Sequence, residues 1–167
     1  MIRFAVVLGL LIACGPGVKG GGPSMNNKMG GGGEIEKPVS PVVSSSILAR
    51  EPLANKVEVK HILIGWKSVG RDGKPNDKRA MEREKSDAET LVKTIVGQLR
   101  ANAIDFDTAM KTYSEDPGSA SGARPYTVAH DDMNFDSDFR MLSIRLNTDE
   151  FGVVESQFGF HIIKRIQ

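Results

Sequence analysis

The sequence changes character at residue 57, and this change confines any compact domain to the last two thirds of the 167-residue chain. Most of the 18 glycines lie before residue 35, and residues 38–46 are rich in proline, serine and valine. No helical or strand period persists over residues 15–56, which predicts a flexible tether. The remaining segment of about 110 residues is long enough to bury one hydrophobic core.

The charge and composition disfavour several functional classes. The formal net charge is +1 and the chain has one tryptophan, so neither a strong field nor an aromatic and basic surface points to nucleic acid. The glycine clusters are not followed by Gly-Lys-Ser or Gly-Lys-Thr, which disfavours a phosphate-binding loop. No long apolar stripe is left over for an oligomer. We therefore expect a monomer with no nucleic-acid partner and no cofactor.

Residues 1–14 have the pattern of an export signal. One positive side chain, Arg3, precedes an apolar stretch over residues 4–13. Ten helical residues span about 15 Å, half of a hydrocarbon core of about 30 Å, so the stretch suits a signal peptide rather than a membrane span. The only cysteine, Cys14, follows Ala13 at its end. This end resembles the lipobox of bacterial lipoproteins; the alternative is an ordinary secretory signal with a cysteine there by chance.

The lipobox resemblance implies that cleavage before Cys14 leaves this residue as a lipidated N-terminus that anchors the chain to a membrane of the cell envelope. Gly15 is not the aspartate that resembles an inner-membrane retention signal, so the outer membrane is favoured. The expected organisation is a signal peptide over residues 1–13, the lipidated cysteine and tether over residues 14–56, and a domain over residues 57–167.

Hydrophobic periodicity predicts that this domain is of the α+β class. Residues 57–64 form a strand with two apolar faces, which is typical of the centre of a sheet. Helices are predicted from Ser86, whose spacing to Glu89 fits a capping box, and from Asp105. The remaining predicted elements are a short strand near 125–128, a helix near 136–146 and two closing strands at 152–156 and 160–166. This order suits a small, largely antiparallel sheet.

Two histidines occupy strand positions where apolar residues are expected. His61 interrupts the first strand and His161 lies in the last one. Ser156 precedes His161 across a turn, and Asp116 follows a predicted helix. A strand histidine is more often a core or surface residue than a catalytic one, and an aspartate before Pro117 is an ordinary turn former. The pattern alone therefore leaves a structural and a functional interpretation open.

Three sequence blocks, in this order, resemble parvulin-type peptidyl-prolyl cis/trans isomerases. Residues 59–64 resemble the first strand of that family, residues 106–121 its second helix and active-site loop, and residues 152–164 its C-terminal hairpin. The resemblance implies a parvulin/FKBP-like domain, in which a small four-stranded, mostly antiparallel sheet is wrapped by three or four helices. It also implies a pair of histidines on the concave face of the sheet.

By position in these blocks, the resemblance implies that His61 and His161 are the pair. It implies that Asp116 fills a position that holds Asp or Cys, and that the Ser156 hydroxyl bonds to the pair. The side chains expected to hold the proline ring are Met133, Phe135, Phe139, Tyr126 and Phe158.

Residues 122–126 depart from the family pattern, which often has Gly-Gly-Asp-Leu-Gly with a leucine that faces the substrate. Either Pro125 or Tyr126 supplies this wall, or the pocket is altered. The charged loop over residues 67–85 carries offsetting acidic and basic residues, which favours a solvated loop over a site for a phosphate before proline.

The implied function is non-covalent isomerisation of X-Pro bonds in exported, unfolded or folding polypeptides. The alternative is a peptide-binding chaperone or assembly factor without catalysis. A zinc site is disfavoured because His61 and His161 have no third ligand at a recognisable spacing. A hydrolase is disfavoured because the only cysteine lies in the signal and no nucleophile-elbow motif occurs.

Overall fold

The computed structural model describes residues 39–122 and 124–167. The predicted signal peptide, Cys14 and most of the predicted tether lie outside these residues. In the described part of the chain, no helix combines the length and the apolar character that crossing a bilayer requires.

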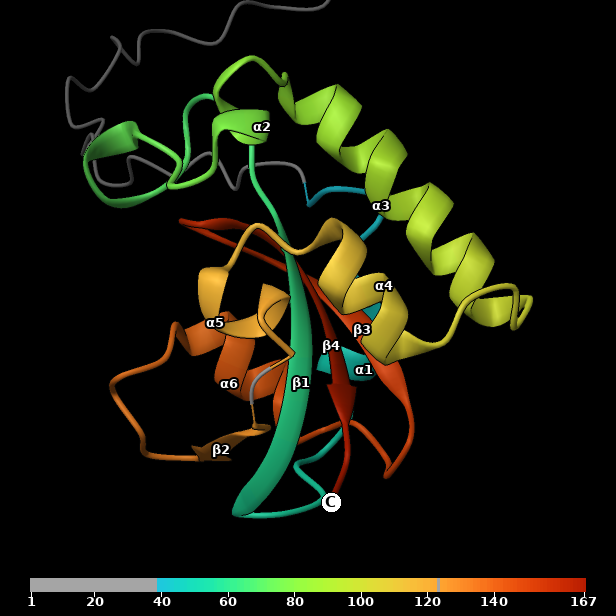
Figure 1. Cartoon of the computed structure of the whole chain (residues 1–167). Coiled ribbons are helices and arrows are strands. Elements are labelled where there is room, and N and C mark those ends of the chain that lie inside the picture. The colour runs from blue at the N-terminus through green and yellow to red at the C-terminus, as the bar shows by residue number, and fades with distance from the viewer. Residues whose placement is uncertain (1–38, 123) are drawn as a thin grey trace, which may run out of the picture. The chain divides into compact units, whose positions relative to one another are not determined.

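Four antiparallel strands form one sheet in the order β2-β1-β4-β3 (Figure 1). Their bounds are Lys56–Ile64 for β1, Tyr126–Ala129 for β2, Phe151–Ser156 for β3 and Gly159–Arg165 for β4. The first strand pairs with β2 through its first half and with β4 through its second half. This confirms the prediction, made from its two apolar faces, that β1 lies inside the sheet.

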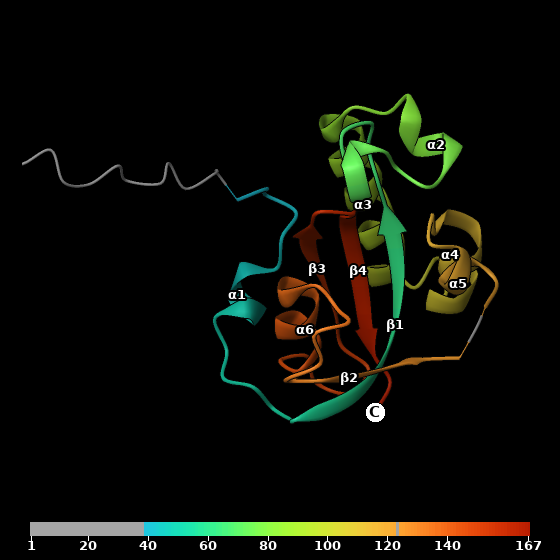
Figure 2. The ribbon, with the colours of Figure 1, turned by 90° about the vertical axis from the view of Figure 1, so that its left-hand side faces the viewer.

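Helices cover both faces of the sheet, so the domain has three layers (Figure 2). The helices are α1 (Ser45–Leu48), α2 (Lys78–Met81), α3 (Lys85–Arg100), α4 (Phe106–Tyr113), α5 (Pro117–Ala120) and α6 (Ser137–Ser143), with a 3-10 turn at Arg71–Gly73. Three of the six α-helices have only four residues. The α+β class and the small antiparallel sheet are confirmed, with short helices added that no sequence period revealed.

The side-chain alternation of β1 and β4 divides the core into two clusters. Ile62, Ile64 and Ile162 face α3 and α4 and are fully buried. Val59 and Ile163 point to the opposite face, where they pack with α1 and α6. Because alternate residues of a strand point to opposite faces, His61 and His161 share this second face.

The helix starts agree with the sequence in one case and differ in another. Asp105 caps α4, where its side chain accepts from the backbone N–H of Thr108 at 2.9 Å. The predicted capping box of Ser86 and Glu89 is wrong, because α3 begins at Lys85 and Ser86 already lies within it. The Glu89 carboxylate instead accepts a hydrogen bond of 2.6 Å from the hydroxyl of Ser40, 49 residues away.

The segment of residues 39–50, here called the N-terminal strap, packs on the domain, although the sequence places it in the tether. The Ser44 backbone N–H donates to the Val153 carbonyl at 2.8 Å, and the Ser44 hydroxyl accepts from the Val153 N–H at 2.9 Å. These bonds occupy the outer edge of β3. Compact structure therefore begins before the predicted boundary at residue 57, and a four-residue helix is too short to leave a periodic signal.

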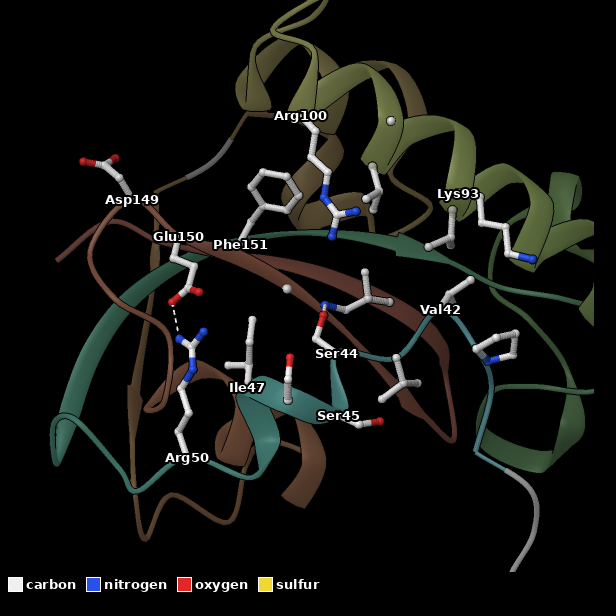
Figure 3. A pocket seen from close by; sticks show the side chains of 18 residues that line it. Val42, Ser44, Ser45, Ile47, Arg50, Lys93, Arg100, Asp149, Glu150 and Phe151 are labelled. Atoms are coloured by element: carbon white, nitrogen blue, oxygen red, sulfur yellow. Dashed lines mark hydrogen bonds and ion pairs between the residues drawn. The ribbon is translucent and has the colours of Figure 1, made fainter.

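The most buried apolar side chain that fastens the strap to the core is Ile47 (Figure 3). Ile47 is 7% exposed and packs in the cluster that contains Leu142. Gly152 makes this possible, because a Cβ there would lie 3.1 Å from Ile47 Cδ1. Arg50 closes the strap with an ion pair of 2.7 Å to Glu150.

We predict that Ile47→Ala lowers the free energy of unfolding by about 2–4 kcal/mol, because it leaves a cavity between the strap and β3. Val39→Ala in the same strap is the matched control, since Val39 is 69% exposed and its truncation costs less than about 0.5 kcal/mol. Urea unfolding of both variants measures the difference. If both substitutions lowered the free energy of unfolding by the same small amount, the strap would be part of a loose tether.

Candidate functional site

Four of the predicted polar residues lie in one row across the sheet. His61 Nδ1 and His161 Nδ1 are 3.2 Å apart, and each histidine is 6% exposed. The Ser156 hydroxyl lies 2.8 Å from His161 Nε2. At the other end, Asp116 Oδ2 lies 3.4 Å from His61 Nε2, a contact that is longer than a normal hydrogen bond and mainly electrostatic. The order along the row is Asp116, His61, His161, Ser156.

The row has one consistent direction of hydrogen bonding when both imidazoles are neutral. An ionised Asp116 only accepts, which places the proton of His61 on Nε2. His61 Nδ1 is then an acceptor, and His161 Nδ1 donates to it. His161 Nε2 accepts from the Ser156 hydroxyl, whose oxygen also accepts from the Phe158 backbone N–H at 3.0 Å. Three of the four ring nitrogens thus have a hydrogen-bond partner, and the fourth, His61 Nε2, faces the Asp116 carboxylate.

The Asp116 carboxylate is also the N-cap of α5. Its Oδ2 accepts from the backbone N–H and the hydroxyl of Ser119, both at 2.8 Å, and from the Tyr126 hydroxyl at 3.0 Å. The nearby His61 and the two Ser119 donors lower the pKa of Asp116 well below its usual range, against the opposing effect of burial. Asp116 therefore stays ionised at neutral pH.

Burial and the neighbouring His61 lower the pKa of His161 well below its ordinary value, although the negative Asp116 acts in the opposite direction. Burial and the same carboxylate raise the pKa of Tyr126. Both groups are therefore neutral at pH 7, and Tyr126 keeps the proton that it donates to Asp116.

A buried ion pair holds the loop that carries Asp116. Glu115 is 4% exposed and accepts from Arg83 at 2.6 Å and from the Gly65 backbone N–H at 2.7 Å. Its own N–H donates to the Leu63 carbonyl at 2.9 Å, and the Leu63 N–H donates to the hydroxyl of Ser114. The loop is therefore bonded to β1 two residues beyond His61, which fixes Asp116 beside it.

An aromatic cluster lies against the two imidazoles. The Phe139 ring is 5.2 Å from each imidazole centroid, edge to face, and is 3% exposed. Phe135 stacks on Phe139 at 5.4 Å, and the Tyr126 ring lies 6.1 Å from Phe135. Phe139 is thus mainly a support for the histidines. The half-buried rings of Phe135 and Tyr126 are the apolar surface that a ligand can reach.

The other two predicted ring-binding residues are not part of this cluster. Met133 is 83% exposed in the connection between β2 and α6, where its short sequence distance from Phe135 does not bring it against the core. The Phe158 side chain is half-buried in the β3–β4 turn, and its backbone supports Ser156.

Sequence reasoning missed several residues that hold the site together. Ser119 is one of them: Asp116, expected as a turn former after a helix, is also the N-cap of α5, and its contact with Ser119 follows the usual spacing of an N-cap. That spacing is visible in the sequence. The pairing of Glu115 with Arg83 has no such signal, because 32 residues separate them.

Two grooves cross the described surface. One, of about 790 Å³, lies between the strap, α3 and the start of β3, and contains none of the predicted site residues (Figure 3). The other, of about 820 Å³, reaches Ser156. Within residues 39–122 and 124–167, no three histidine, cysteine or acidic side chains are grouped in a way that could hold a metal ion.

The lowered pKa of His161 predicts that the domain loses stability in mild acid. As the pH falls through about 6.5, His161 is protonated in the unfolded chain but stays neutral in the folded one. The stability of the folded state is therefore complete above about pH 6.5 and decreases below it. The slope is limited to about 1.4 kcal/mol per pH unit for one proton. We expect His161→Gln to flatten the dependence of unfolding free energy on pH between 7 and 5.

Urea unfolding at a series of pH values measures this slope, and His130→Gln is the control because His130 is exposed. A slope that His161→Gln leaves unchanged would assign the acid sensitivity to other groups.

Comparison with known proteins places this geometry in a family. The model of the PPIC-type PPIASE domain matches residues 45–167. A segment of 110 residues, 65% of the chain, is 31% identical to the chaperone SurA of Photorhabdus laumondii, and a segment of 78 residues, 46% of the chain, is 37% identical to that of Pseudoalteromonas translucida. These matches cover 22% and 18% of the two relatives, so the chain spans about a fifth of their length.

Solved structures share the fold. The peptidyl-prolyl isomerase ESS1 of Candida albicans matches with a TM-score of 0.59 at 16% identity, over 68% of this chain and 63% of that one. TbPIN1 matches with a TM-score of 0.57 at 19% identity, over 68% of this chain and 99% of that one. Because the family model matches most of the chain, the protein belongs to the PPIC-type peptidyl-prolyl isomerase family, the parvulins.

Proposed function

We propose that this protein catalyses cis/trans isomerisation of X-Pro bonds in exported, unfolded or folding polypeptides, without a covalent intermediate. The observation that carries the proposal is the row of Asp116, His61, His161 and Ser156, with each imidazole nitrogen in contact, beside a partly open aromatic surface. Membership of a family defined by this activity supports it.

The reaction needs rotation about a bond with partial double-bond character, which takes tens to hundreds of seconds without a catalyst. In the twisted transition state the amide loses its resonance, so it is less polar than the planar amide. An apolar surface stabilises this state relative to water. Phe135 and Tyr126 are the reachable rings, and they hold the proline ring by burial.

The polar row holds the carbonyl side of the same bond. Its members are fixed by Ser119, Glu115 and the Phe158 backbone, so they do not need to reorganise when the amide twists. The Asp116 carboxylate is a poor nucleophile toward an amide carbonyl, and its role is to set the tautomer of His61 and the local field. Each 1.4 kcal/mol removed from the barrier gives a rate about tenfold higher.

A peptide-binding chaperone without catalysis is the second candidate. The name of the SurA relatives as chaperones and the altered segment over residues 122–126 support it. The two candidates share the aromatic surface and differ in whether the polar row accelerates rotation.

We predict that the protein accelerates the proline-limited refolding of a model substrate and that His61→Ala or Asp116→Asn lowers kcat/KM at least about tenfold, because each change breaks the row. Asp116→Asn keeps an oxygen that can cap α5 while it removes the charge. Urea unfolding of the same variants must show a relative loss of unfolding free energy that is smaller than the relative loss of kcat/KM.

His130→Ala is the matched control, since this exposed histidine lies outside the row. If the wild-type protein binds unfolded substrate but leaves the refolding rate unchanged, the chaperone is the correct alternative. If the variants lost activity and stability to the same extent, the histidines would be residues of the core without a catalytic role.

The proposed setting is the cell envelope, with a lipid anchor on Cys14 and the outer membrane favoured. The support is the apolar stretch before Ala13-Cys14 and the glycine after it. Several acyl chains on one residue would hold the chain firmly, whereas one chain binds only marginally. The tether then keeps the domain near the membrane.

We predict that Cys14→Ser abolishes lipid attachment and moves the protein from the membrane fraction to the soluble fraction of the envelope. Fractionation combined with mass spectrometry of the N-terminal peptide measures both effects, and His130→Ala again serves as a control for expression. Membrane retention without Cys14 would contradict a lipid anchor at this residue.

A further inference from the structure

The groove that reaches Ser156 is lined by apolar side chains and by three carboxylates, and we call it the acidic groove. Its apolar lining includes Trp66 and Val69 from the segment after β1 and Val43 from the strap. Its three carboxylates are those of Asp136, Asp138 and Glu155. The groove has a volume of about 820 Å³, which is enough for several residues of an extended peptide.

The acidic groove is continuous with the histidine row. Ser156 lines the groove and also contacts His161 Nε2 at 2.8 Å. Val154, another lining residue, pairs with His161 across β3 and β4. A polypeptide whose proline lies against the row therefore has its neighbouring residues within reach of the groove.

The charge of the groove is negative. Lys85 is its one cation among the described lining residues, and this cation is already bound to Glu155 at 2.6 Å and lies 5.3 Å above the Trp66 ring. No cation among the described lining residues pairs with Asp136 or Asp138, although Asp136 caps α6 by accepting from the Asp138 backbone N–H at 3.0 Å. Partial burial raises the pKa of Asp138, and the like charges of Asp136 and Glu155 add to this effect.

Three basic side chains of the charged loop over residues 67–85 form ion pairs with carboxylates of the protein itself. Lys67 pairs with Glu84, Arg79 with Asp77 and Arg83 with Glu115, as these ion pairs show. These three basic side chains therefore already have carboxylate partners. The carboxylates of the acidic groove are the charges that lie next to Ser156.

We propose that the acidic groove binds the substrate residues next to the proline and selects a lysine or arginine there. This inference rests on the proposed function and names the substrate class. The aliphatic stem of the basic residue packs against the apolar lining while its charged end meets Asp138 and Asp136. An aspartate, glutamate or phosphate at the same place meets like charge and is disfavoured.

The test uses the full chain in neutral detergent and three matched peptides, Ala-Xaa-Pro-Phe with lysine, alanine or glutamate at Xaa. Exchange NMR measures isomerisation of each peptide without a coupling protease. We expect kcat/KM to fall in the order lysine, alanine, glutamate, with about fivefold between the extremes for an exposed ion pair worth up to about 1 kcal/mol. Added salt reduces the difference by screening.

Asp138→Asn is expected to reduce the differences in kcat/KM among the three peptides, and Asp138→Lys is expected to reverse the order of their kcat/KM values. The Asp138 side chain is exposed and caps no helix, so both variants should fold. Glu58→Gln is the matched control, because it removes one exposed carboxylate at the far end of β1 and should leave the order unchanged.

Equal kcat/KM for all three peptides would overturn the selectivity and leave the proposed function intact. If the protein isomerises none of the peptides, the proposed function is overturned. The affinities of the peptides, measured by titrating them into the same protein, then test the acidic groove. In that case the lysine peptide must bind more tightly than the glutamate peptide, and equal binding would overturn the acidic groove as well.

Discussion

The pairing register of β1 and β4 is the constraint on which the site depends. Ile62 pairs with Ile162 on the α3 face, and this pairing places Leu63 opposite His161 on the other face. A slip of one residue would move His161 to the wrong side of the sheet. The turn also holds the register, because a Cβ at Gly159, whose φ is +136°, would lie 2.5 Å from the Ile64 carbonyl oxygen. The apolar residues on one face thus position the polar row on the other.

Burying this row is costly unless every polar atom has a partner, and the hydrogen-bond direction explains how the cost is met. The two imidazoles satisfy each other through one Nδ1–Nδ1 contact, and the outer nitrogens reach Ser156 and Asp116. The ionised Asp116 lies at the half-exposed end of the row, where Ser119 and Tyr126 donate to it. A charge at the centre of the row would have met a much larger desolvation penalty.

The strands, the two main helices and all four members of the polar row were predictable from the sequence, because each lies in a segment with a strong period or a recognisable block. Contacts between distant segments were not. Ser40 bonds to Glu89, and Glu115 to Arg83, across separations of 49 and 32 residues that no local pattern links. The strap was missed for the same reason, since its stability comes from Ile47 against the sheet rather than from local propensity.

The segment over residues 122–126 shows how a departure from the family pattern is accommodated. The sequence left Pro125 and Tyr126 as alternative walls, and the structure gives Tyr126 a polar role as well, because its hydroxyl lies 3.0 Å from Asp116 Oδ2. Gly118 permits this approach, since a Cβ there would lie 2.5 Å from that hydroxyl. One side chain thus contributes an apolar ring beside Phe135 and a donor to the row. The aromatic surface and the charge of Asp116 are therefore coupled through Tyr126, so a change at Gly118 would alter both.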